Sequence, residues 1–315
     1  MEGSDDSAPA EPMGEPTAGL DSVQKRDRQW PTTVLGSVAH LFRLIEDIDG
    51  SNHLRRDLHF RGQSDAALTL KPTLTRMTEG LALEQVLAIE NAMLDDFGRL
   101  SSPLVSGRMQ LFGRPDPVEQ WMLMQHHGAP TRLLDWTSSI FVATYFSCLS
   151  QADRDGAVWF FLGNALEARE NRSERRNWDE TEWGHEDRLW LASNQWCYAF
   201  QSIRPTERML AQAGRFTVAT DPRTDHATLI DRGTEGETLE SYTHRKFVIP
   251  SKLKPELLHR LHSMNVTAST LFPGIDGVGR SLHEKAMLYR AVALRLATPA
   301  PADTLPQPTT GDSAP

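Results

Sequence analysis

Short apolar runs with the composition of β-strands are separated in this chain by groups of segments with helical periodicity. The strand-like runs lie at 59–62, 156–162, 215–220 and 245–250. Apolar side chains recur every three or four residues across 34–48 and 80–99, which predicts helices, and a further helix is predicted at 251–264. Because strands and helices do not alternate regularly, the pattern predicts an α+β fold. Short strands would form a mixed sheet packed with helical clusters, rather than a doubly wound parallel sheet.

The stretch QHHGAPTRLLDWT at 125–137 places a turn between two further predicted helices. The first helix should end at Gly128, which suits a C-cap, because Pro130 cannot continue a helix. The second should begin near residues 137–139, where hydroxyl side chains can cap exposed N–H groups. Its sequence, IFVATYFSCLS, is apolar nearly all round, so we expect this helix to be deeply buried.

Both ends of the chain differ in composition from the segment between them. Residues 1–29 and 298–315 are rich in Ala, Pro, Gly and polar residues and lack an apolar period, which predicts disordered tails. We therefore expect one domain at 30–297. The chain has only two cysteines and a formal net charge of −9, and it shows neither a signal peptide nor a membrane span. These features favour a cytoplasmic protein without broad affinity for nucleic acid.

Two arginines are candidate binding groups. Arg61 precedes Gly62 at the end of an apolar strand, where backbone can approach a ligand while the guanidinium holds a phosphate or carboxylate; pairing with a core carboxylate is the alternative. Arg132 can form a salt bridge with Asp135 that fastens the loop. Alternatively, it can reinforce the following helix N-terminus, near residues 137–139, in binding a diphosphate.

Metal and common nucleotide motifs are absent from the sequence. His126 and His127 are adjacent, and adjacent helical residues point about 100° apart, so they do not share a face. The chain has no HExxH, CxxC or EF-hand pattern, and we expect no metal. It also lacks the GxGxxG, Walker and GxSxG motifs of common dehydrogenases, NTPases and hydrolases.

Several motifs together resemble the FRG domain family, which is named for a Phe-Arg-Gly tripeptide. The matching segments are FRGQ at 60–63, LKPTLTR at 70–76, QHHGAPTRLLDWT at 125–137, YFS at 145–147 and GAVWF at 156–160. The family is distantly similar to ADP-ribosyltransferases. The resemblance therefore implies an ADP-ribosyltransferase-like fold with NAD as the candidate substrate.

The resemblance also implies a set of site residues. Arg61-Gly62 matches the element that holds the nicotinamide nucleotide, and the polar start of TSSIFVATYFS resembles a second element. The AQAG turn resembles a third, but Gln212 stands where a transferase usually has glutamate. The predicted catalytic residues are Arg61, His127, Asp135 and Gln212. The predicted cofactor-binding residues are Arg61, Gly62, Gln63, Arg132, Thr137 and Ser138.

Two classes of function follow from these expectations. The first is ADP-ribosyl transfer to a protein or nucleic-acid acceptor, or NAD cleavage, with toxin-like effects on a cell. The second is a non-catalytic module that binds a nucleotide, a nucleic acid or a partner protein in a stress or phage-defence system. Gln212 favours the second class, because a neutral amide lacks the charge that stabilises an oxocarbenium-like transition state.

Overall fold

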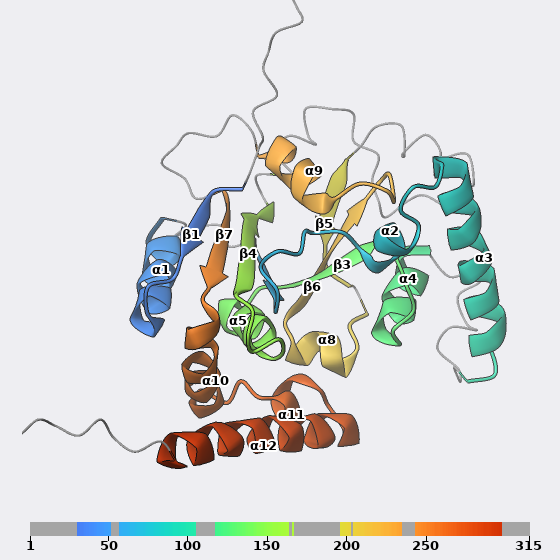
Figure 1. The fold of residues 1–315 in the computed structure, drawn as a ribbon. Coiled ribbons are helices and arrows are strands. Elements are labelled where there is room, and N and C mark those ends of the chain that lie inside the picture. The colour runs from blue at the N-terminus through green and yellow to red at the C-terminus, as the bar shows by residue number, and fades with distance from the viewer. Residues whose placement is uncertain are drawn as a thin grey trace, which may run out of the picture.

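A seven-stranded mixed sheet forms the centre of the computed structural model (Figure 1). The structure describes residues 30–51, 57–104, 117–163, 166, 196–202, 204–234 and 243–297, so the two predicted tails lie outside the described residues. The strand order is β1-β7-β4-β2-β3-β6-β5, in which β1 and β7 are parallel and all other neighbours are antiparallel. Helices pack on both faces, and the fold is α+β, as the sequence predicts.

The strands are β1 Thr32–Val34, β2 Leu58–Gln63, β3 Leu133–Thr137, β4 Gly156–Leu162, β5 Cys197–Phe200, β6 Gly214–Ala219 and β7 His244–Ile249. The α-helices are α1 Val38–Ser51, α2 Thr73–Met77, α3 Leu83–Ser101, α4 Pro117–His126, α5 Ile140–Cys148, α8 Glu207–Ala211, α9 His226–Gly233, α10 Lys254–Ser263, α11 Ala268–Leu271 and α12 Ile275–Ala297. A 3₁₀ turn, η1 Ser251–Leu253, precedes α10.

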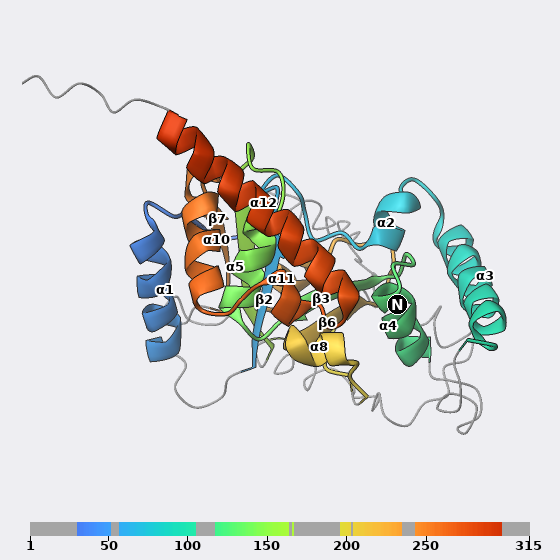
Figure 2. The ribbon, with the colours of Figure 1, turned by 90° about the horizontal axis from the view of Figure 1, so that it is seen from below.

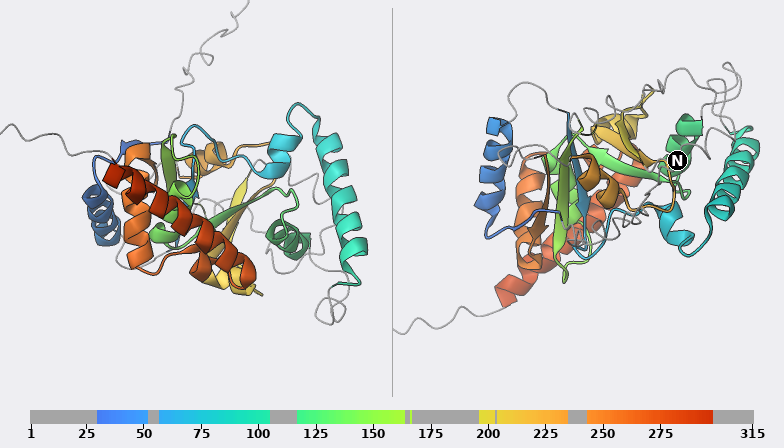
Figure 3. Two further views of the ribbon diagram at one scale, coloured as in Figure 1. Left: turned by 60° about the horizontal axis from the view of Figure 1, so that its bottom comes forward. Right: turned by 90° about the horizontal axis from the view of Figure 1, so that it is seen from above.

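Successive side chains of the central strands point to opposite faces of the sheet, and they pack into a hydrophobic core on each face. Val158 and Phe160 of β4 pack with α1, α5 and α10 on one face. Trp159 and Phe161 of the same strand pack with α9 on the other face. The helix α12 crosses beneath α5, α10 and α11 (Figure 2), while α3 packs on α4 at the opposite end of the sheet from α1 (Figure 3).

The sheet is weakly joined at its centre. Strands β2 and β3 share one paired position, Phe60 opposite Thr137, whereas β2 and β4 are paired along six positions from Leu58 to Gln63. Beyond the Phe60–Thr137 pair the hydrogen-bonded ladder of β2 and β3 stops. Backbone and side-chain groups at this split are therefore available to line a pocket.

Several local predictions are corrected by the structure. The helix predicted at 34–48 begins only at Val38, because β1 pairs with β7 before it. Residues 133–137, which the sequence pattern places in the turn between two helices, form β3, since Leu133 and Leu134 enter cores on opposite faces. The polar composition of residues 221–241 suggests a loop, but this segment contains α9.

Candidate functional site

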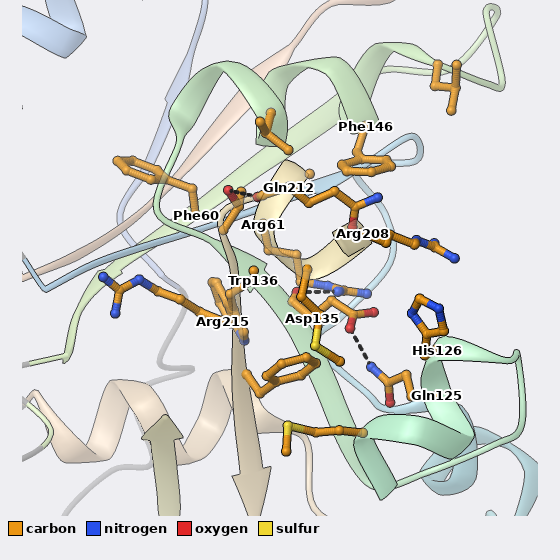
Figure 4. Close-up of a pocket in the computed structure, with 18 of the residues that line it drawn as sticks. Phe60, Arg61, Gln125, His126, Asp135, Trp136, Phe146, Arg208, Gln212 and Arg215 are labelled. Carbon is orange, nitrogen blue, oxygen red and sulfur yellow. Dashed lines mark hydrogen bonds between the residues drawn. The ribbon is translucent and has the colours of Figure 1, made fainter. Parts of the chain in front are cut away.

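A pocket of about 340 Å³ opens at the split between β2 and β3 (Figure 4). Its walls come from β2, β3, β6, α4, α5 and α8, so segments far apart in the sequence meet there. The lining residues are Phe60, Arg61, Gly62, Ser64, Met122, Gln125, His126, Asp135, Trp136, Thr137, Val142, Phe146, Leu149, Arg208, Met209, Gln212, Gly214, Arg215 and Phe216. Aromatic and aliphatic walls with a few charged groups are typical of a small-molecule site.

Arg61 lies at the strand split, and Figure 4 shows it directed toward Asp135. Its Nη1 donates a hydrogen bond to the main-chain carbonyl of Asp135 at 2.6 Å, while its Nε is buried without a hydrogen-bond partner. Burial lowers the pKa of the Arg61 guanidinium; Asp135 raises it and Arg76 lowers it further. The group remains charged at neutral pH, because an arginine guanidinium does not lose its proton in proteins. The pocket wall thus holds a positively charged guanidinium group that has a hydrogen-bond donor without a partner.

Gly62 and Gln63 follow Arg61 but have structural contacts. A Cβ atom added at Gly62 would lie 1.9 Å from the carbonyl oxygen of Ala143, so the glycine allows α5 to pack directly on β2. Gln63 donates to the Thr69 carbonyl at 2.9 Å and accepts from the indole N–H of Trp159 at 2.6 Å. The close approach expected at Gly62 is therefore made by helix backbone.

Asp135 is exposed into the pocket from the middle of β3. Its carboxylate accepts a hydrogen bond from Gln125 Nε2 at 2.7 Å, and Gln125 in turn accepts one from the Thr131 hydroxyl. Among the described residues that line the pocket, Asp135 is the only carboxylate. Gln125 thus fixes the orientation of the one acidic group at the site.

The structure places His126, rather than His127, in the pocket. His127 is exposed and does not line it, although the two rings meet edge to face at 4.9 Å. Burial lowers the pKa of His126; His127 and Arg208 lower it further, and Asp135 raises it. His126 is therefore neutral at neutral pH and can accept or donate a hydrogen bond.

Two more arginines and Gln212 complete the wall. Arg215 pairs with Asp57 at 2.8 Å. Arg208 forms no ion pair within the described ranges, and Figure 4 shows it on the same side of the pocket as His126. The Gln212 amide donates to the Leu271 carbonyl at 3.1 Å, which fastens the end of α8 to α11.

Arg132 lies outside the pocket, contrary to the sequence-based assignment. Its side chain is buried against Glu90, with Nε 2.7 Å from Oε1, and it also donates to the Thr220 carbonyl at 2.8 Å. The prediction of a salt bridge between Arg132 and Asp135 is wrong, because Arg132 pairs with Glu90. Arg132 lies just before β3, whereas Asp135 of β3 lines the pocket.

The groups at the N-terminus of α5, which the sequence pattern assigned to ligand binding, form hydrogen bonds within the protein. Thr137 lines the pocket, but its hydroxyl donates to the Gln212 carbonyl at 2.7 Å and accepts from the Ser139 N–H at 3.0 Å. Ser139, the N-cap of α5, accepts from Val142. The N–H of Ser138 donates to the Ala213 carbonyl, and Ser138 does not line the pocket.

Sequence reasoning missed Gln125, His126 and Arg208 as pocket residues. Met122, Gln125 and His126 lie three and four residues apart on α4, so helical spacing gave a signal for their common face. Arg208 lies in the same short helix that ends at Gln212, but no local pattern indicated which of its side chains would face the pocket.

The structure thus combines an α+β fold with a pocket that is lined by three arginines, Arg61, Arg208 and Arg215. The FRG domain family model matches residues 56–156, and the chain contains an FRG domain. The matched segment includes β2, β3, α4 and α5, and thus most of the pocket. Comparison with curated proteins and with solved structures found no significant match.

The described segments contain no group of three or more His, Cys, Asp or Glu side chains arranged to hold a metal ion. Likewise, none of the helices in this part of the chain combines the length and apolar character needed to cross a membrane.

Proposed function

We propose that the pocket at the β2–β3 split binds a nucleotide, with NAD as the first candidate. The observation that carries the proposal is Arg61, whose buried Nε has no hydrogen-bond partner, in a pocket that is also lined by the aromatic residues Phe60, Trp136 and Phe146. Guanidinium groups bind phosphate and carboxylate oxygens through paired N–H donors. Aromatic walls favour the flat ring of a base.

The same pocket supports cleavage of the nicotinamide glycosidic bond, followed by ADP-ribosyl transfer or hydrolysis. That reaction passes through an oxocarbenium-like state, which a nearby carboxylate stabilises by its charge and by hydrogen-bonding a ribose hydroxyl. Gln212 supplies no charge, and its amide is bonded to Leu271. Asp135 is the carboxylate in position, oriented by Gln125.

Purified protein incubated with NAD labelled on the adenylate phosphate tests the proposal. Nicotinamide release and label transfer would be followed in wild type, Arg61→Gln and Arg43→Gln, where Arg43 is an exposed residue of the distant helix α1. We expect NAD affinity to fall at least about tenfold in Arg61→Gln and to stay unchanged in the control. Wild-type protein that neither binds nor consumes NAD would contradict the proposal.

Asp135→Asn separates binding from chemistry. The asparagine oxygen can still accept from Gln125, so the local hydrogen bond survives while the charge is lost. If Asp135 stabilises the transition state, nicotinamide release should fall roughly 100- to 1000-fold with little change in NAD affinity. Equal activity in this variant would remove Asp135 from the reaction.

The second candidate is a non-catalytic module that binds a nucleotide, nucleic acid or protein, as the neutral and fastened Gln212 favours. Retained, Arg61-dependent nucleotide binding without nicotinamide release would support this function. An affinity for RNA or DNA that falls steeply with salt would support a nucleic-acid ligand instead.

A further inference from the structure

The pocket is small for a dinucleotide. Its volume of about 340 Å³ lies near the lower end of the range of roughly 300–1,000 Å³ that is typical of small-molecule sites. One nucleoside-sized end of a ligand such as NAD would fill it. The remaining part must then lie at the mouth, where groups beyond the lining residues can contact it.

Two arginines contact one phenyl ring next to the pocket. The guanidinium carbon of Arg208, on α8, lies 4.8 Å from the centroid of the Phe272 ring, and that of Arg280, on α12, lies 4.5 Å from it. Phe272 also meets Phe146, a pocket residue, edge to face at 6.0 Å. Figure 2 shows α8, α11 and α12 gathered on this side of the molecule.

The phenyl ring orients these guanidinium groups without neutralising them. A cation–π contact holds the planar group over the ring, but the full positive charge and the edge N–H donors remain. Neither Arg208 nor Arg280 forms an ion pair with a carboxylate of the described residues. Their donors are therefore free for an anion from solvent.

The two charges also repel one another. Burial lowers the pKa of Arg208, Asp135 raises it, and Arg280 lowers it. Holding like charges together costs free energy, which a bound anion between or beside them would offset. Such an arrangement is common at sites that bind anionic ligands.

We propose that Arg208 and Arg280 form an outer phosphate subsite, which holds the diphosphate of a ligand whose nucleoside end lies in the pocket beside Arg61. This inference rests on the proposed nucleotide function. It assigns the ligand to the class of dinucleotides and nucleoside diphosphate derivatives, with the diphosphate at the mouth. It also gives a role in binding to α12, which lies outside the segment matched by the family model.

Calorimetric titration of the full chain with three probes tests the subsite: NAD, nicotinamide riboside, which lacks the diphosphate, and inorganic pyrophosphate. The variants are Arg208→Gln, Arg280→Gln and Arg290→Gln, the last removing an exposed positive charge from the same helix two to three turns away. Arg280 is exposed, so its replacement should leave the fold intact, as thermal unfolding would verify.

We expect Arg208→Gln and Arg280→Gln each to weaken the binding of NAD and of pyrophosphate about tenfold. The affinity of each variant for these ligands should also depend less on salt concentration. Riboside affinity should be unchanged in Arg280→Gln, and Arg290→Gln should match wild type. Unchanged NAD affinity in Arg280→Gln, or an equal loss of riboside affinity, would overturn the subsite even if NAD is cleaved.

The two proposals fail in different ways. If wild type does not bind NAD but binds pyrophosphate through Arg208 and Arg280, the NAD function is wrong and the phosphate subsite stands. If Arg61-dependent NAD cleavage persists unchanged in both variants, the NAD function stands and the subsite is wrong. If wild type binds neither NAD nor pyrophosphate, both are wrong.

Discussion

At the scale of single residues, the partners of two arginines separate a structural role from a binding role. Arg132 donates to Glu90 and to backbone carbonyls, and its guanidinium also lies 4.9 Å from the Trp121 ring centroid. Its hydrogen-bonding capacity is used inside the protein. Arg61 uses Nη1 on a carbonyl but leaves a buried Nε without a partner. Of these two arginines, only Arg61 therefore has a donor left for a ligand at the pocket.

Removing either partner of the buried Arg132–Glu90 pair should destabilise the protein. Breaking a buried pair by removing one partner leaves an uncompensated charge and costs about 3–5 kcal/mol. We expect Glu90→Leu and Arg132→Met each to lower the free energy of unfolding by this amount, measured with urea. The double variant should lose clearly less than the sum of the two, because no lone charge remains. Additive losses would show that the pair is not coupled.

Sequence patterns could not identify this pair. Arg132 and Glu90 are 42 residues apart, and their contact depends on how α3 packs against β3 and β6. Asp135, three residues from Arg132, was the nearer carboxylate in sequence. Arg61, in contrast, was found from the sequence because a strand, an arginine and a glycine are adjacent there.

At the scale of secondary structure elements, the contact between β2 and α5 sets the pocket wall. A Cβ atom at Gly62 would lie 1.9 Å from the Ala143 oxygen and 2.8 Å from the Ser147 nitrogen, both backbone atoms of α5. The helix would have to move away from the strand. Since Val142 and Phe146 of α5 line the pocket, the pocket would move with it.

We therefore expect Gly62→Ala to lower the free energy of unfolding by about 1–3 kcal/mol or more and to weaken ligand binding. Gly36→Ala is the matched control, because nothing lies within 4 Å of a Cβ atom at that position. Urea unfolding and NAD titration of both variants check the prediction. Wild-type stability in Gly62→Ala would show that α5 does not pack on β2 as described.

Elements with a clear local signal were predicted well. Helices α3, α4 and α5 and strand β4 were predicted close to their observed bounds from helical spacing, glycine and proline positions and a long apolar run. Strand β3 was missed because its two leucines are adjacent and enter different cores, so the apolar/polar alternation is broken. The choice between His126 and His127 depended on the rotation of α4 about its axis, which the packing against β3 determines.

At the scale of the whole molecule, the pocket and the core behind it are joined by a chain of hydrogen bonds. Trp136, a pocket residue, donates from its indole N–H to the Thr217 hydroxyl at 2.8 Å. Thr217 lies 2.8 Å from Nδ1 of His226 in α9. An indole nitrogen can only donate, so Thr217 accepts from Trp136, and its hydroxyl proton is available to Nδ1 of a neutral His226. The neutral form of His226 thus supports the pocket wall from the opposite face of the sheet.

Because these hydrogen bonds need a neutral His226, we expect the free energy of unfolding to fall in acid. Burial, together with the positive charges of Arg61 and Arg132, lowers the pKa of His226 to about 3. In the unfolded chain the pKa is about 6.5, so between these values only the unfolded state binds the proton. Stability from this residue is complete above about pH 6.5 and is lost as the pH falls toward 3. At pH 4.5 the expected loss is roughly 2–3 kcal/mol.

His226→Asn isolates this contribution, because the asparagine oxygen can accept from Thr217 but does not titrate. We expect wild type to be the more stable protein at pH 7.5, and its advantage should shrink by roughly 2–3 kcal/mol at pH 4.5, measured by urea unfolding at both values. His59, whose pKa burial lowers to about 4, and the carboxylates titrate in both proteins and cancel in the difference. A difference that stays constant with pH would mean that His226 accepts a proton in the folded state, and that the Trp136–Thr217–His226 chain does not hold it neutral.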